Sequence, residues 1–282
     1  MVHPSRRTLH TQGIMLLVAT TFIWGTTFAL VKDTADSLSP ATLVATRFAI
    51  AALIFVPSIR HLNARLLIDG SLLGLVFFIS LVSQVIGLET ISANRAAFIT
   101  SLNVILVPLF EPLLGRRVKT VAFLAAGLAL TGIGVMSWEG GVPGVGDLWI
   151  FICALSYAVY ILLLEAVASR HSPMSLSAVQ LLVSAVLGLA WAAPELFGQL
   201  GALGANFGAV LYLGLIATAA VTWTQAIGQR WVSASESALI YALEPVFAAI
   251  FSFWLLGESL GTRGLVGAAL VVAATLLSQS RR

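Results

Sequence analysis

Residues 93–117 read ANRAAFITSLNVILVPLFEPLLGRR, and residues 234–258 read ASESALIYALEPVFAAIFSFWLLGE. The two stretches are similar enough to indicate an internal repeat. Upstream, Ser39-Pro40 and Ser172-Pro173 are placed to open one helix in each half of the chain. Repeated hydrophobic bundles of this kind are typical of secondary transporters, which build two gates around one central site. The repeat therefore favours a transport function.

The composition is that of a membrane protein. Of the 282 residues, 59% are hydrophobic and only 10% are charged, and the mean hydropathy is +1.00. A soluble domain carries about 25% charged residues, so this chain has too few charges to cover a water-facing surface. The basic residues lie in short loops rather than on one face, which argues against a nucleic-acid partner. The lone Cys153 excludes a disulfide framework and a cysteine-based zinc site.

Ten apolar segments are long enough to cross a bilayer, which takes about 20 residues. The loops between them are short, so we expect no separate soluble domain. The first segment follows Arg6-Arg7 but runs for about 19 residues with no small-x-small cleavage site after it, which predicts a retained helix rather than a signal peptide. The predicted fold class is an all-α membrane protein with ten transmembrane helices, at 13–31, 40–58, 67–88, 94–114, 119–138, 147–168, 173–194, 206–228, 234–256 and 262–279.

The distribution of Lys and Arg predicts the orientation. With the N-terminus in the cytoplasm, the inner loops and tails collect 11 of these residues and the outer loops collect three, namely Lys32, Arg95 and Arg263. This bias places both termini in the cytoplasm. Ten spans form two sets of five, and because five is odd, the second set enters the membrane from the opposite side. The sequence therefore predicts two inverted five-helix repeats, at 1–141 and 142–282.

The repeat-related positions follow two spacings. A spacing of 133 holds over the first two helices of each half, and a spacing of 141 holds over the fourth helices, after which a slip of one residue aligns Gly115 with Gly257. Where matching positions differ inside the membrane, symmetry is broken, and we expect substrate selection there. The matching pairs are Trp24 with Tyr157, Ser39 with Ser172, Arg47 with Gln180, Ser92 with Ser233, and Asn103 with Glu244.

The chain resembles the drug/metabolite transporter superfamily, and within it the EamA type, in which two five-helix units are fused. The resemblance implies a ten-helix inverted-repeat fold in the bacterial inner (plasma) membrane that moves small organic metabolites. Since the family includes amino-acid exporters, an amino-acid exporter is one reading. Arg116 departs from the glutamate that the family usually has there, as at Glu258. The matching segments are FIWGTTFALVK at 22–32, LSPATLVATRF at 38–48, AAFITSLNVILVPLFEPLLGRR at 96–117, GDLWIFICALSYAVYILLLE at 146–165 and ALIYALEPVFAAIFSFWLLGE at 238–258.

Ionisable residues inside the membrane are costly and usually face a cavity or one another. Arg47 is the only basic residue well inside a span, and it can serve as a counter-charge for a substrate carboxylate or as part of a structural ion pair. Glu244 precedes Pro245 on the ninth span, and Asn103 takes its place on the fourth. Glu244 can bind a proton and couple transport to it, or act as a structural acceptor for Arg47 or for a backbone amide freed by the proline.

Uncharged polar and aromatic residues complete the candidate site. Gln84, Gln180 and Gln225 can hydrogen-bond a zwitterion or hold helices together. A mid-membrane Trp or Tyr can line a pocket for an apolar or aromatic substrate, and some of six such aromatics are expected to do so. Glu111 and Glu165 are interpreted as boundary residues. The predicted substrate-binding set is Trp24, Phe28, Arg47, Gln84, Asn103, Tyr157, Tyr160, Gln180, Trp223, Tyr241 and Glu244.

Residues near the helix ends and on the last helix of each half have structural interpretations. Four tryptophans are expected to anchor the protein at the membrane interface, and five glycines allow close helix contact. The resemblance implies that these last helices stand away from the transport path, as scaffold or as a homodimer contact. The tryptophans are Trp138, Trp149, Trp191 and Trp254, and the glycines are Gly127, Gly132, Gly134, Gly264 and Gly267.

Other functional classes fit less well. The sequence has no HExxH, GxSxG or nucleotide-binding motif, so we expect neither an enzyme nor a cofactor. A passive channel or facilitator for small polar solutes remains the alternative, although the repeat and the kink-forming Pro108, Pro112 and Pro245 favour a carrier. The predicted function is a secondary transporter that works by alternating access and exports small organic metabolites such as amino acids. Its expected partners are that solute, the lipid bilayer and a second copy of the chain.

Overall fold

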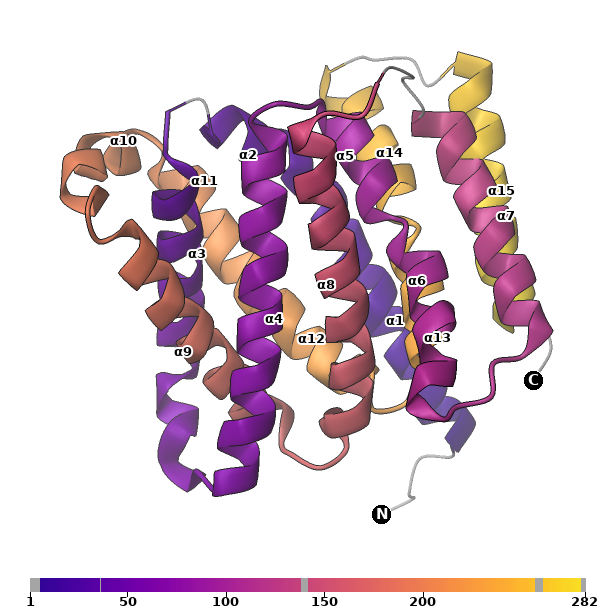
Figure 1. Ribbon diagram of the computed structural model, residues 1–282, viewed down its shortest axis with the longest axis horizontal. Coiled ribbons are helices and arrows are strands. Elements are labelled where there is room, and N and C mark those ends of the chain that lie inside the picture. The colour runs from indigo at the N-terminus through magenta and orange to yellow at the C-terminus, as the bar shows by residue number, and fades with distance from the viewer. Residues whose placement is uncertain (1–5, 36, 138–141, 257–260, 280–282) are drawn as a thin grey trace.

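The computed structural model describes residues 6–35, 37–137, 142–256 and 261–279, and these residues form helices without any strand (Figure 1). Most helices run side by side along one direction, and the two ends of the chain lie at the same end of the bundle. We call this end the terminal end and the other the distal end. The predicted all-α class is confirmed for the described residues.

Eight helical segments of the described chain are long and apolar enough to cross a membrane. They coincide with eight of the ten predicted spans, so the chain is an integral multi-pass membrane protein. The predicted span at 119–138 corresponds to a shorter apolar helix, Thr120–Met136. The predicted span at 13–31 is divided between two helices, neither of which meets the same criteria. Trp138 and Gly257 lie outside the described residues.

The first half contains one helix or broken helix for each predicted span. Its elements are α1 (Arg6–Gly25), α2 (Thr27–Ala35), α3 (Pro40–Phe55), η1 (Val56–His61), α4 (Ala64–Leu88), α5 (Ala93–Thr100), α6 (Asn103–Phe110), η2 (Glu111–Leu114) and α7 (Thr120–Ser137).

The second half follows the same order and adds one short helix pair, η3 and α10, that the sequence did not predict. Its elements are α8 (Val145–Ala168), α9 (Pro173–Ala192), η3 (Leu196–Gln199), α10 (Leu200–Ala205), α11 (Phe207–Gly214), η4 (Leu215–Ala220), α12 (Val221–Gly228), α13 (Ala234–Tyr241), α14 (Glu244–Leu256) and α15 (Gly261–Gln279).

The two opening serines form helix caps, as their spacing to proline predicts. The Ser39 side chain accepts a hydrogen bond from the Thr42 amide, and the Ser172 side chain accepts one from the Ser175 amide. Each cap satisfies one of the backbone amides that a helix start leaves without a partner, and the proline that follows lacks that amide and has a φ suited to the first turn. The repeat is therefore visible in the local structure of α3 and α9.

The fourth and ninth spans are both broken, and at matching places. α5 ends before Ser101-Leu102, and α13 ends before Ala242-Leu243, 141 residues later. In the second half, Pro245 has no amide hydrogen to donate to a carbonyl of the preceding turn, and this missing hydrogen bond permits the break. In the first half, the Ser101 hydroxyl donates to the Ala97 carbonyl at 2.7 Å, a back-bond that bends helices. Two different local causes thus produce the discontinuous helices on which many transporters build their sites.

The two halves of the chain are interleaved rather than stacked. α3 packs on α9, α4 packs on both α8 and α9, and α1 packs on α12, α13 and α14. α7 and α15 form a pair at one edge of the bundle, and most of their contacts are with each other (Figure 1). Any site at the centre is therefore bounded by helices of both halves.

Close glycine contact between α7 and α15 is confirmed for Gly132 and Gly267. A Cβ on Gly132 would lie 2.7 Å from the Gly267 carbonyl oxygen, whereas a Cβ on Gly127 would meet no described atom within 4 Å. We expect Gly132→Leu to force the two helices apart, at a cost of about 1–3 kcal/mol. A lower melting temperature of the purified protein in detergent measures this effect. Gly127→Leu on the same helix is the matched control, and equal melting temperatures for the two variants would contradict the packing.

Candidate functional site

A small cavity, the central cavity, lies between the two halves of the chain. Its volume is about 40 Å³, which is room for about three waters by the usual measure of about 10–15 Å³ for each. An amino-acid-sized solute does not fit in this conformation. Eight lining residues come from the first half and three from the second, namely Trp24, Thr27, Arg47, Phe77, Ser80, Leu81, Gln84, Thr100, Cys153, Tyr157 and Glu244.

Arg47 reaches the cavity from α3 and is held by a π-helix. Its Nε donates to the Thr218 hydroxyl at 2.6 Å, and its Nη2 donates to the Ala217 carbonyl at 3.4 Å. Both partners lie in η4, a π-helical stretch in which the wider turn changes which carbonyls are available, as often happens at functional sites. Trp24 Nε1 donates to the same Ala217 carbonyl at 3.4 Å.

One nitrogen of the Arg47 guanidinium has no partner among the described residues. Arg47 is 3% exposed, and its Nη1 has no hydrogen-bond partner among the described residues. None of the ion pairs in the described part of the chain involves Arg47, so the predicted structural ion pair is not seen. An unpaired donor in a buried site is costly. The geometry therefore suits the other interpretation, a counter-charge that a solute carboxylate completes.

Glu244 lies in the wall of the same cavity, whereas its repeat partner does not. It is the first residue of α14, directly after the break in the ninth span. Asn103 begins α6 at the matching break and is 4% exposed, but it is not among the cavity-lining residues. The cavity thus has a carboxyl group from one repeat and no counterpart from the other. Arg47, Cys153 and Tyr157 share this wall with Glu244.

An aromatic cluster closes one side of the cavity. The Trp24 ring lies 5.5 Å from the ring centroids of both Tyr157 and Tyr241. The Gln225 amide donates to the Tyr157 hydroxyl at 2.5 Å and to the Tyr241 hydroxyl at 3.1 Å. These contacts hold the rings in fixed positions and satisfy their polar ends. Trp24 and Tyr157, which are related by the repeat, therefore contact each other in the wall of the cavity.

The structure brings some predicted site residues to the cavity and leaves others elsewhere. Trp24, Arg47, Gln84, Tyr157 and Glu244 line it, and Tyr241 supports the rings. Tyr160 donates to Gln180 at 3.2 Å and stacks behind the lining residues Phe77 and Tyr157 without lining the cavity itself. Trp223 is 39% exposed on the outside of the bundle. The side chain of Phe28 lies outside the described residues.

Six residues of the cavity wall did not appear among the sequence candidates. They are Thr27, Phe77, Ser80, Leu81, Thr100 and Cys153. The Ser80 hydroxyl contacts the Cys153 carbonyl at 3.3 Å and its sulfur at 3.4 Å. Mid-span Ser, Thr and Cys are common in apolar helices, so their presence alone could not single them out.

Polar contacts tie the two halves together at both ends of the bundle. At the terminal end, Arg116 pairs with Glu165, and the Ser235 hydroxyl donates to Glu111 at 2.9 Å. His10 lies 3.0 Å from Glu236 at the same end. At the distal end, Arg95 pairs with Asp147, and the Ser39 hydroxyl donates to Glu195. Arg95, on the first turn of α5, and Glu236, on the first turn of α13, are related by the spacing of 141. The starts of these two matching helices therefore form contacts at opposite ends of the bundle.

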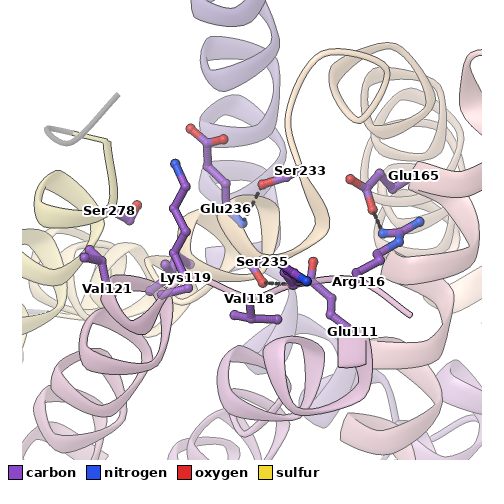
Figure 2. A pocket seen from close by; sticks show the side chains of 13 residues that line it. Glu111, Arg116, Val118, Lys119, Val121, Glu165, Ser233, Ser235, Glu236 and Ser278 are labelled. Atoms are coloured by element: carbon purple, nitrogen blue, oxygen red, sulfur yellow. Dashed lines mark hydrogen bonds and ion pairs between the residues drawn. The ribbon is translucent and has the colours of Figure 1, made fainter. Parts of the chain in front are cut away.

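A second and larger cavity, of about 450 Å³, opens at the terminal end (Figure 2). It lies between the ends of the fourth, sixth and ninth spans and the α7–α15 pair. Its charged residues come from both halves and include Glu111 and Glu165, the two predicted boundary residues. The lining residues are Glu111, Arg116, Arg117, Val118, Lys119, Val121, Ala122, Glu165, Ser233, Ser235, Glu236, Leu239 and Ser278.

Comparison with known families gives one match that covers almost the whole chain. The EamA-like transporter family matches twice, over residues 11–138 and 144–279. A solved structure entitled "Crystal structure of protein" has the same fold, with a TM-score of 0.75 and 20% identity over 95% of this chain and 96% of that one. The double match agrees with the repeat that residues 93–117 and 234–258 indicate.

Three curated relatives illustrate the range of names among similar proteins. An "Uncharacterized transporter" of Archaeoglobus fulgidus is 30% identical over 94% of this chain and 85% of its own length. A "Probable terminal-alkyne amino-acid exporter" of Streptantibioticus cattleyicolor is 24% identical over 96% of this chain and 94% of its own. An "S-adenosylmethionine/S-adenosylhomocysteine transporter" of Chlamydia muridarum is 26% identical over 88% and 85%.

Proposed function

The chain belongs to the EamA-like transporter family and is a membrane transport protein, and from this premise we propose that it is a secondary transporter that exports small zwitterionic metabolites such as amino acids by alternating access. The observation that carries the proposal is the small central cavity with Arg47 and Glu244 in its walls. Residues of both repeats meet there, and Arg47 is buried.

Alternating access follows from the size of this cavity and from the ties at its two ends. A solute larger than a few waters reaches Arg47 only when the halves separate at one end. The contacts between the halves at the terminal and distal ends have to break in turn for this to happen. A central cavity too small for the solute supports a carrier, whereas an open channel needs a continuous path through the bundle.

The membrane topology in this proposal is that of ten spans in two inverted units, 1–141 and 142–282. α1 with α2, and α7, supply the two spans that the length and hydropathy criteria leave out. The terminal end faces the cytoplasm, because the excess of Lys and Arg lies there. Export then means that solute loads at the terminal end and leaves at the distal end. In a bacterium the membrane is the inner one.

The chemistry of the cavity supports a solute with an α-amino carboxylate group. The free Nη1 of Arg47 is placed for a carboxylate, with which arginine forms strong charge-assisted hydrogen bonds. The Trp24 and Tyr157 rings offer an apolar surface for a side chain. The names of two relatives specify an amino acid and S-adenosylmethionine, and both compounds carry this group. The two named solutes differ outside this group, so the proposal for this chain includes only the zwitterionic group.

Counterflow in proteoliposomes tests this function. Vesicles containing the purified protein are loaded with one unlabelled amino acid or S-adenosylmethionine, and uptake of the labelled compound is followed. A carrier moves external label faster into vesicles that are loaded with its own solute, because the loaded carrier reorients faster than the empty one. A passive channel shows no such trans-stimulation. Uptake without trans-stimulation for every compound would replace the carrier with the channel alternative.

Glu244 is proposed to bind the coupling proton, since it lies in the cavity wall and is in none of the ion pairs of the described chain. We expect Glu244→Gln to abolish the pH dependence of flux while counterflow, which needs no net proton movement, continues. Asn103→Ala at the matching position is the control and should leave the pH profile unchanged. An unaltered pH profile in Glu244→Gln would remove Glu244 as the proton site.

A further inference from the structure

The cavity at the terminal end is about 450 Å³, against about 40 Å³ at the centre. Small-molecule sites have volumes of about 300–1,000 Å³, so the terminal cavity, and not the central one, has room for a metabolite in this conformation. Both repeats contribute to it. Glu111 and Arg116 come from the first, and Glu165, Ser235 and Glu236 come from the second.

The charges of this cavity balance, because three acidic and three basic side chains line it. The acidic ones have partners within the protein, since Glu165 pairs with Arg116, Glu111 accepts from Ser235, and Glu236 contacts His10. Arg117 and Lys119, in contrast, form no ion pair among the described residues. A balanced lining disfavours a purely anionic or purely cationic ligand and suits one that carries both charges.

The two charges are also placed for such a ligand. Figure 2 shows the Lys119 ammonium and the Glu236 carboxylate extending on the same side of the pocket, away from the Arg116–Glu165 pair. Lys119 is exposed at the start of α7, and Glu236 is 5% exposed on the first turn of α13. Glu236 contacts the His10 ring at 3.0 Å.

We propose that the terminal cavity is a loading site for zwitterionic α-amino acids, in which Lys119 binds the carboxylate and Glu236 binds the ammonium. The inference rests on the proposed transport function and adds a second binding position to it. Solute waits there on the way to the central cavity. The ties of the terminal end, Glu111 with Ser235 and Arg116 with Glu165, line the same cavity.

Direct binding tests the site without requiring transport. Isothermal titration of the full-length protein in nanodiscs uses L-leucine, L-leucinamide, which lacks the carboxylate, and N-acetyl-L-leucine, which lacks the ammonium. We expect wild type to bind leucine at least about tenfold more tightly than either analogue, as loss of one charge-assisted hydrogen bond predicts. Lys119→Gln should abolish the preference for leucine over leucinamide and retain the preference for leucine over N-acetylleucine. Glu236→Gln should have the opposite result, with loss of the preference over N-acetylleucine only.

Two controls keep this test falsifiable. Lys119→Arg should restore the preference for leucine, and Arg230→Gln, which removes a basic residue outside the pocket lining, should leave it unchanged. If wild type binds N-acetylleucine as well as leucine, the cavity is an anion site, and the proposal is overturned. Unchanged preferences in Lys119→Gln and Glu236→Gln would place the binding elsewhere, with the same result.

Sided transport separates this proposal from the proposed function. With an amino acid that shows counterflow, Lys119→Gln should raise KM at least about tenfold when solute is presented at the terminal end. KM at the distal end and the maximal rate should stay within about twofold of wild type. Equal changes in KM at both ends would overturn the loading site and leave the carrier intact. Absence of counterflow together with Lys119-dependent binding would overturn the carrier and leave the site.

Discussion

Arg47→Gln is expected to reduce the rate of transport at least about 30-fold, because it removes the central positive charge that a solute carboxylate requires. Loss of a buried, hydrogen-bonded charge partner typically costs about 2–5 kcal/mol, and each 1.4 kcal/mol is a factor of ten. The variant also loses the donors to Thr218 and Ala217 that hold η4 in place. Initial rates of counterflow in proteoliposomes measure the effect.

Gln180 provides the matched control for Arg47. The two positions are repeat-related and both are buried, but Gln180 lies between α4, α8 and α9, where it accepts from Tyr160. Gln180→Leu should lower the melting temperature and leave the KM of the folded protein unchanged. Arg47→Lys, which keeps the charge without the planar pair of donors, should retain part of the activity. Transport by Arg47→Gln at the wild-type rate would contradict the central site.

Locking the terminal end is expected to stop transport completely. Glu111 belongs to the first half and Ser235 to the second, and their side chains meet at 2.9 Å. Cysteines at these two positions, joined by a short reducible thiol crosslinker in a Cys153→Ser background, cannot separate. Counterflow should fall to the level of protein-free vesicles and return when the crosslink is reduced.

The control is the same double variant before crosslinking, which should transport. Arg95 and Asp147 form the related tie at the distal end, and a crosslink between cysteines there should also block transport. Continued counterflow with either end locked would show that the halves do not move apart at that end. It would contradict alternating access even if Arg47 proved essential.

Sequence reasoning recovered most of the architecture because it rests on strong, long-range signals. Hydropathy located eight spans that the structure contains, and the repeat located the caps at Ser39 and Ser172. The repeat also matched Trp24 with Tyr157, and the structure places these two rings in contact. These features depend on residue types that recur at fixed spacing, so they can be found without coordinates.

The finer geometry of the site depends on packing between helices, which a single sequence does not specify. The π-helix at Leu215–Ala220 has no proline or glycine to mark it, yet it supplies both partners of Arg47. The aromatic residues Trp223 and Tyr157 look alike in an apolar span, and only the rotation of each helix places one outside and the other in the cavity. For the same reason, Asn103 and Gln180, which the sequence analysis placed in the site, do not line the cavity in the structure.

The lone cysteine of the chain offers the most direct test of alternating access. Cys153 lines the central cavity and is 2% exposed in the closed conformation. A membrane-impermeant thiol reagent, added to one face of the membrane at a time, should label it from either face in the unlocked protein, and Cys153→Ser should show no labelling. When the cysteines at positions 111 and 235 are crosslinked in a protein that retains Cys153, labelling of Cys153 should continue from the distal face and stop from the terminal face. Labelling from the terminal face at an undiminished rate in the locked protein would contradict a carrier whose halves open at one end at a time.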